Sequence, residues 1–145
     1  MNPAQTSRDR QLAGRCLCGA VEYQVADAFR YAALCHCPDC RRSTGSAFKP
    51  FAGIERERLR VTRGADGLMR YGDAAGHDAH CRRCGSLLYS LVRDGSFVHV
   101  AMGTLVDAPS LRPTHHIFVG SKAPWFTISD GLPQYLAHAP AGAGG

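Results

Sequence analysis

Apolar residues recur at every second position in several short segments of this chain. The pattern is clear at 21–25, 59–61 and 87–91, and residues 97–102 and 117–119 have the same character. Side chains two residues apart point to the same face of an extended strand, so each segment predicts a strand. Because glycine, proline and aspartate separate these segments, we expect a mainly β, antiparallel domain of two or more packed sheets.

Little of the sequence favours helix. Residues 38–43, with a proline in the first turn, are one candidate, and residues 132–137 are the other. With 145 residues and no internal linker, the chain predicts a single zinc-binding domain at 13–137. The polar residues 1–12 and the small residues 138–145 have little to pack, and we expect both to be flexible tails.

Composition and charge bound the function. No apolar run approaches the roughly 18 residues of a membrane span, and the polar start lacks the apolar stretch of a secretion signal. A reducing cytoplasm is therefore the expected compartment. The net charge of +5 could favour an anionic partner, but the basic residues are spread thinly. Without a long basic run or an aromatic-rich RNA-binding motif, nucleic acid is not an expected partner.

Cysteine is the most informative residue type. All seven cysteines lie in three tight groups: Cys16-Leu17-Cys18, Cys35-His36-Cys37-Pro38-Asp39-Cys40 and Cys81-Arg82-Arg83-Cys84. Thiols this close together are poor disulfide partners but suit a soft metal such as zinc, and an odd count also points to metal. A closed structural zinc takes four ligands and a reactive one commonly three. We therefore infer two zinc ions per chain, one closed and one open.

The closed site is predicted around a zinc-knuckle pattern. Cys81-x-x-Cys84 is followed by Gly85, which can adopt the backbone conformation that the tight turn needs. Cys16 and Cys18 are the expected partners, because two pairs complete a tetrahedral site whereas a pair and the triple would supply five ligands. The pairs are far apart in sequence, so this zinc would join distant strands and should be structural.

The open site is predicted at Cys35, Cys37 and Cys40, which offer three thiolates and no evident fourth ligand. His36 is the tempting candidate, but on an extended segment its side chain points away from the flanking cysteines. His80 is likewise expected to be a neighbour of the other site and not a ligand. The fourth position would then be free for water or substrate.

The charge of such a site favours thiol chemistry. Three thiolates leave a zinc site at about −1, which acidifies water less than a three-histidine site does. A soft, electron-rich zinc is better suited to capturing a thiol, stabilising it as thiolate and presenting it to an electrophile. We therefore expect thiol transfer rather than hydrolysis.

Other residues are expected to be structural. His99 and His116 lie in or beside predicted strands and should be hydrogen-bonded at a sheet. Trp125 is expected to pack in the core. Phe48 and Phe51 are also expected in the core, with the wall of a pocket near the open zinc as the alternative.

The segments around the cysteines carry a family resemblance. They are 14–21, 35–41 with Gly45, and 81–86, and the likeness continues through 103–105, 116–119 and 121–125. On these motifs the chain resembles the family of the glutathione-dependent formaldehyde-activating enzyme and centromere protein V. The resemblance implies a β-tent fold, a structural zinc at Cys16, Cys18, Cys81 and Cys84, and a catalytic zinc at Cys35, Cys37 and Cys40.

The resemblance also implies an activity. The reaction for which the family is named adds glutathione to formaldehyde and gives S-(hydroxymethyl)glutathione; the reverse reaction is that of a carbon–sulfur lyase. We therefore expect a zinc-dependent lyase whose partners are a small thiol such as glutathione and a small aldehyde. Arg41, Arg42 and Lys122 are the candidate contacts for the carboxylates of glutathione.

Two other functions stay open. The family includes a chromatin-associated protein, so the chain could be a non-enzymatic zinc module that binds a protein or nucleic-acid partner. The cysteine triple could instead be a labile thiol cluster in redox or metal handling, which predicts easy zinc loss and reversible oxidation. A fourth protein ligand at the triple would contradict catalysis, whereas an open position would favour it.

Overall fold

The computed structural model of the protein describes residues 10–140, whose strands form two sheets. The small sheet has the order β1-β2-β5, with β1 at Gln11–Arg15, β2 at Glu22–Ala26 and β5 at Leu59–Arg63. The large sheet has the order β10-β3-β4-β9-β8-β7-β6. Its strands are β3 (Tyr31–Cys35), β4 (Lys49–Glu55), β6 (Leu68–Gly72), β7 (His77–Cys81), β8 (Leu87–Val92), β9 (Phe97–Ala101) and β10 (His116–Ile117).

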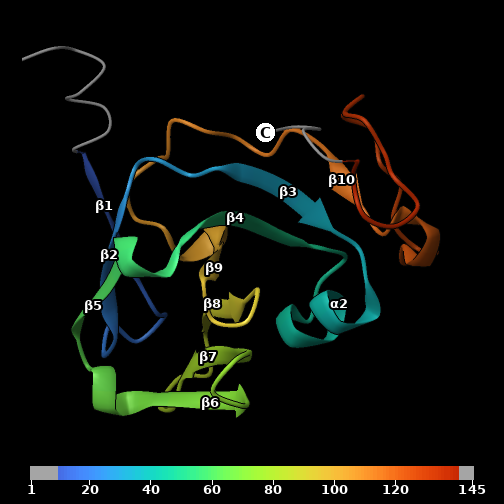
Figure 1. Cartoon of the computed structure of the whole chain (residues 1–145). Helices are drawn as coiled ribbons and strands as arrows, with labels where there is room; N and C mark the ends of the chain where they lie inside the picture. The colour runs from blue at the N-terminus through green and yellow to red at the C-terminus, as the bar shows by residue number, and fades with distance from the viewer. Residues whose placement is uncertain (1–9, 141–145) are drawn as a thin grey trace, which may run out of the picture.

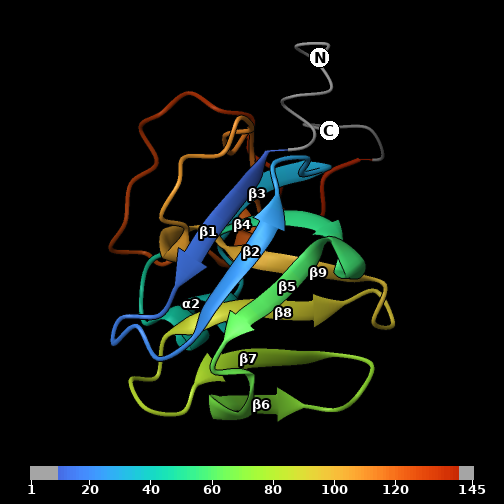
Figure 2. The same ribbon diagram turned by 90° about the vertical axis from the view of Figure 1, so that its left-hand side faces the viewer.

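The small sheet covers one face of the large sheet, and the helix α2 (Pro38–Thr44) lies on the other side (Figure 1). Seen from the small sheet, its strands run across those of the large sheet (Figure 2). The main core fills the space between the two sheets. Its largest fully buried side chains include Leu12 and Tyr23 from the small sheet and Ile54, Leu88 and Val100 from the large one. The mainly β, two-sheet fold predicted from the alternating segments is therefore confirmed.

Strand pairing is antiparallel with one difference from expectation. β10 pairs parallel to β3, with His116 opposite Leu34, after a long connection that includes the short 3-10 turn η3 (Met102–Thr104). The other 3-10 turns are η1 (Arg56–Arg58), η2 (Ala65–Gly67) and η4 (Val119–Ser121). A parallel neighbour requires such a crossover and cannot follow a hairpin turn.

The second predicted helix, at 132–137, is wrong. The segment is not helical, and it forms a bridge between Gln134 and His116 of β10. The backbone N–H of Tyr135 donates to the His116 carbonyl, and the His116 N–H donates to the Pro133 carbonyl. These bonds to β10 use the groups that a helix would pair internally, and Pro133 has no N–H to contribute to a helix.

The helix predicted at 38–43 is confirmed as α2. Pro38 opens its first turn, and the Cys37 sulfur accepts the backbone N–H of Cys40 at 3.3 Å, in the manner of an N-cap. Gly45 ends the helix in the left-handed region at φ 64°. The turn of α2 therefore brings Cys40 back beside Cys37.

The folded part of the chain begins earlier than the expected boundary at residue 13. β1 begins at Gln11 and Leu12 is fully buried, so the folded part starts before residue 13, because Leu12 faces the core between the sheets. Residues 1–9 and 141–145, which make up most of the expected tails, lie outside the described residues.

The expectation that Trp125 packs in the core is wrong, because its side chain is 71% exposed. In the described range, no helix is long and apolar enough to cross a membrane.

Candidate metal centres

Four cysteines from both sheets meet at one point. Cys16 and Cys18 lie in the turn between β1 and β2, Cys81 ends β7, and Cys84 lies in the turn that follows. Their four sulfur atoms all lie within 4.8 Å of one another. The Cys16–Cys18 and Cys18–Cys81 sulfur separations are 3.7 and 3.8 Å. Tetrahedral zinc with Zn–S bonds of about 2.3 Å places its sulfur ligands about 3.8 Å apart, so this group could hold such an ion.

Backbone and side-chain donors surround these sulfur atoms. The Val21 N–H donates to Cys16 Sγ at 3.3 Å, and the Cys84 N–H donates to Cys81 Sγ at 3.4 Å. Hydrogen bonds from the Ser86 side chain and backbone lower the pKa of Cys84 to about 5. Donors of this kind favour the thiolate, which is the form that binds metal.

The second group gathers the remaining three cysteines. Cys35 ends β3, Cys37 caps α2 and Cys40 lies in the first turn of that helix. Their sulfur atoms lie within 4.8 Å of one another, and within residues 10–140 no further cysteine, histidine or carboxylate joins the group. The Cys35 thiol, followed by burial, raises the pKa of Cys40 far above its ordinary value. Thiols that suppress one another's ionisation become jointly ionised when a divalent cation binds, so this donor set also fits a soft metal.

His36 is not part of either group. Its side chain is fully buried, and its Nε2 is hydrogen-bonded to Nδ1 of His116 at 2.8 Å. The Nε2 of His116 in turn donates to the carboxylate of Asp130 at 2.9 Å. His80 also stays outside the groups, with Nδ1 donating to the Gly85 carbonyl at 3.2 Å. Both histidines therefore lie where the sequence placed them, beside the cysteines and outside the clusters.

Lys49 is a candidate functional residue that the sequence did not indicate. It lies opposite Cys35 in the β3–β4 pairing and is only 5% exposed. Its Nζ donates to Ser90 Oγ at 2.8 Å, and that hydroxyl donates to Asp78 at 2.6 Å. The positive charge of Lys49 opposes the rise in the pKa of Cys40, so it favours thiolate in the three-cysteine group. The only sequence signal for Lys49 was its position as a charged residue directly before the apolar run 50–54.

The three predicted substrate contacts differ in position. Arg41 is half-buried on α2, and Arg42 is exposed on the same helix. The Nζ of Lys122 donates to the carbonyl oxygens of Ala123 and Phe126. The charges of Lys122 and Arg41 are among the causes that lower the pKa of His36, which places both close to that ring.

Two buried side-chain polar atoms lack a hydrogen-bond partner within the described part of the chain. They are Nδ1 of His36 and Nε of Arg41. His36 lies between two cysteines of the three-cysteine group, and Arg41 follows the third. Such buried groups are costly unless a ligand or water satisfies them.

A cavity of about 400 Å³ lies beside α2. Its lining includes Ser43 and Thr44 of α2, Lys49 of β4, and Cys84 and Ser86. The cavity therefore lies between the helix of one cysteine group and a turn of the other. Phe51 packs in a small buried cluster with Ala33 and Cys35, against which Cys37 and Cys40 also pack, so it is buried and lies beside the three-cysteine group.

A two-sheet β fold with two cysteine groups that could hold metal ions defines the class of this protein. Residues 11–121 match the profile of the family described as glutathione-dependent formaldehyde-activating enzyme. The chain therefore belongs to this family, and its fold is the β-tent that the resemblance implied.

The chain is also similar to proteins of known structure. One of them is a Rhodobacter sphaeroides protein with a crystal structure, at 30% sequence identity and a TM-score of 0.56. The match covers 68% of this chain and 91% of the other. No curated protein gives a significant match to the sequence.

Proposed function

We propose that the chain is a two-zinc enzyme of the carbon–sulfur lyase type. It would join a small thiol such as glutathione to a small aldehyde such as formaldehyde, or cleave the adduct. The observation that carries the proposal is the three-cysteine group, to which no fourth protein ligand is added in the described range. The four-cysteine group offers a complete ligand set and would hold a structural zinc.

The addition needs no redox partner. The thiol sulfur forms a bond to the carbonyl carbon, the carbonyl π bond breaks, and the thiol proton ends on the former carbonyl oxygen. A zinc ion held by Cys35, Cys37 and Cys40 would supply a soft Lewis acid that lowers the pKa of the incoming thiol. Lys49 would support the ionised sulfur through its buried positive charge.

Substrate binding is assigned to the side chains around α2. Glutathione has two carboxylates, and Arg41, Arg42 and Lys122 are the cations available for them. The cavity of about 400 Å³ is at the small end of the range for ligand sites, so part of a tripeptide would extend over the surface. The proposed location is the reducing cytoplasm, where clustered cysteines more often bind metal than form disulfides.

Thiol binding can be tested by replacing zinc with cobalt. Cobalt-loaded protein has thiolate-to-metal absorption bands, which we expect glutathione to change and S-methylglutathione, which lacks a free thiol, to leave unchanged. Cys37→Ser should abolish the response and bind one metal fewer. The same variant should no longer exchange label with S-(hydroxymethyl)glutathione. Loss of that exchange would link the three-cysteine group to turnover.

Two results would overturn the proposal. The first is an absence of any spectral response to glutathione, cysteine or cysteamine. The second is full activity of Cys37→Ser. The first result, with both metals firmly bound, would instead favour the non-enzymatic zinc module, for which the exposed Trp125 is a candidate contact. The second would show that the reaction does not use the three-cysteine group.

A further inference from the structure

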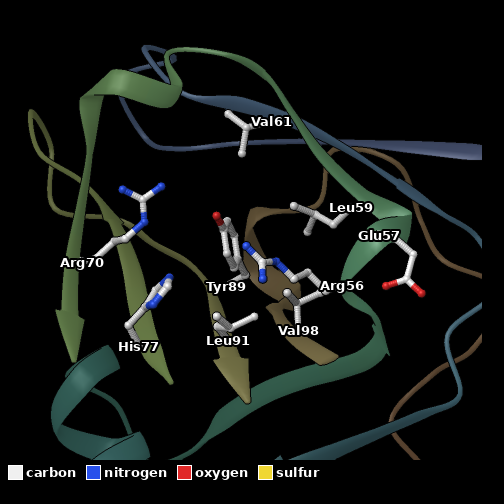
Figure 3. Close-up of a pocket in the computed structure, with 9 residues that line it drawn as sticks. All are labelled: Arg56, Glu57, Leu59, Val61, Arg70, His77, Tyr89, Leu91 and Val98. Atoms are coloured by element: carbon white, nitrogen blue, oxygen red, sulfur yellow. The ribbon is translucent and has the colours of Figure 1, made fainter. Parts of the chain in front are cut away.

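A second cavity lies between the two sheets, away from both cysteine groups. Its volume is about 320 Å³, and no cysteine lines it. It shares no lining residue with the cavity beside α2. Figure 3 shows its side chains converging from η1, β5 and the strands β6 to β9. The proposed thiol chemistry makes no use of this space.

One part of the cavity is apolar. Leu59 and Val61 come from β5 of the small sheet, and Leu91 and Val98 come from the large sheet. Leu91 and Val98 are buried at 4% and 1% exposure, so this wall is a continuation of the core. It would favour the apolar body of a ligand over a fully hydrated ion.

Two arginines provide positive charge at the same cavity. Arg56 belongs to η1 and Arg70 to β6, and both are exposed. Within residues 10–140 neither guanidinium forms an ion pair or a hydrogen bond with another side chain. In Figure 3 both extend toward Tyr89 from different sides of the cavity. Two unpaired guanidinium groups over one apolar wall are an arrangement suited to a carboxylate.

Tyr89 marks the point where the arginines meet the apolar wall. Its side chain is buried, and its hydroxyl has no hydrogen-bond partner in the described range. Burial raises the pKa of Tyr89, and the charges of Arg70 and Arg56 oppose that rise, which places both arginines close to the ring. The hydroxyl is therefore free to donate to a bound oxygen.

The remaining polar residues are compatible with an anion. His77 donates from Nδ1 to the Asp73 carbonyl at 2.8 Å, which fixes the ring and leaves Nε2 available. Glu57 is the acidic residue of the lining, and Figure 3 shows its carboxylate directed away from Tyr89. The groups that face Tyr89 are thus predominantly positive.

We propose that this cavity binds a small monocarboxylic acid with an apolar body, of the size of phenylacetate. Arg56 and Arg70 bind the carboxylate, the Tyr89 hydroxyl donates to it, and Leu59, Val61, Leu91 and Val98 contact the apolar body. The site is separate from the cysteine groups, so its occupancy does not require the proposed lyase activity.

The test is calorimetric titration of the zinc-loaded protein with phenylacetate. Phenylacetamide, which has the same shape without the charge, and inorganic phosphate, which has charge without the apolar body, are the comparison ligands. We expect phenylacetate to bind and both comparison ligands to bind at least about tenfold more weakly, since charge-assisted bonds and apolar burial are each lost in one of them.

Variants locate the binding. Arg70→Gln should weaken phenylacetate binding at least about tenfold through loss of one charge-assisted hydrogen bond. Arg58→Gln is the matched control, because Arg58 is exposed on η1 but does not line the cavity. No binding of phenylacetate at millimolar concentration, equal binding of phenylacetamide or phosphate, or equal affinity of the two variants would overturn the proposal.

Discussion

The imidazole rings of His36 and His116 are joined by a hydrogen bond of 2.8 Å between Nε2 and Nδ1. His116 uses its other nitrogen for Asp130, at 2.9 Å. A carboxylate accepts, so Nε2 of His116 holds a proton, and one further proton lies in the bond between the two rings. Burial, followed by the charge of His116, lowers the pKa of His36 to about 4, so that ring is neutral at pH 7. The pair therefore holds His36 apart from the sulfur atoms of the cysteines on either side.

Replacing His116 tests how much this bond contributes to stability. His116→Phe keeps a ring in a position that is 1% exposed but leaves the buried Nε2 of His36 without a hydrogen-bond partner. An unsatisfied buried polar group costs about 1–3 kcal/mol, and we expect a loss of this size in the free energy of unfolding. Urea denaturation in buffer with a fixed zinc concentration measures it.

Asp130→Asn is the matched control for this prediction. The Asp130 side chain is 42% exposed, and an amide oxygen can still accept from His116. Exposed ion pairs contribute little, so we expect a loss below about 1 kcal/mol. Equal stability of the two variants would show that the bond between the histidines does not hold the site together.

The two cysteine groups should differ in their effect on stability. Cys81→Ser removes a buried ligand from a group that joins the turn between β1 and β2 to β7, and hence the two sheets. A structural zinc contributes its binding free energy to folding, so we expect one metal fewer and a large fall in Tm. Metal analysis together with thermal unfolding at constant zinc measures both.

Cys37→Ser provides the comparison. It should also lose one metal, but serine is a good N-cap and can accept the Cys40 N–H in place of the sulfur, so α2 is expected to persist. We therefore expect the smaller fall in Tm. A larger fall for Cys37→Ser than for Cys81→Ser would contradict the assignment of the structural site.

The strands that the sequence predicted are those with a recognisable apolar pattern along the chain, and two of the missed strands show why the rest could not be predicted. β3 is buried at four consecutive positions, because α2 and β10 lie near it, and so it shows no alternation. β6 is exposed at all but its first residue, so its side chains do not alternate between a buried and an exposed face. The non-helical segment 132–137 depends on the position of His116, which sequence alone did not supply.

The residues of the candidate sites also divide into those that the sequence predicted and those that it did not. The groups Cys35, Cys37, Cys40 and Cys81, Cys84 follow from local spacing, which one turn of chain is enough to realise. Lys49 comes to lie opposite Cys35 through strand register, and Asp130 reaches His116 through chain crossover. Neither residue has a local motif. The one long-range contact that was predicted is that of Cys16 and Cys18 with Cys81 and Cys84. It could be predicted because a closed zinc site needs four ligands.

Gly14 should not tolerate a side chain. It lies opposite Tyr23 in the β1–β2 pairing, and a Cβ at Gly14 would overlap the Tyr23 ring. That ring is held in place by burial and by a hydrogen bond of 2.7 Å to Thr104. We expect Gly14→Ala to lower the free energy of unfolding by about 1–3 kcal/mol or more through overpacking.

Gly103→Ala is the control for this substitution. A Cβ at Gly103 would meet no heavy atom within 4 Å, and we expect its effect on unfolding to lie within about 0.5 kcal/mol. Urea denaturation of both variants gives the comparison. If Gly14→Ala were as stable as Gly103→Ala, the close approach of the Tyr23 ring would not constrain the sheet.

His99 predicts a dependence of stability on pH. Its Nε2 is hydrogen-bonded to the Tyr31 hydroxyl at 2.7 Å, and burial, followed by the charges of Lys49 and Arg93, lowers its pKa to about 3. The unfolded chain binds a proton at this residue near pH 6.5, whereas the folded chain does not. This contribution to stability is therefore complete above about pH 6.5 and is lost as the pH falls toward 3.

Measurements between pH 7 and pH 5 test whether the free energy of unfolding falls as the pH falls. One histidine can contribute a slope of at most about 1.4 kcal/mol per pH unit to the free energy of unfolding. We expect His99→Gln to have a flatter profile than the wild-type protein in urea denaturation, since glutamine does not titrate. His138→Gln, at an exposed histidine, should keep the wild-type slope. The same slope in His99→Gln and His138→Gln would show that protonation of His99 is not what destabilises the folded protein in acid.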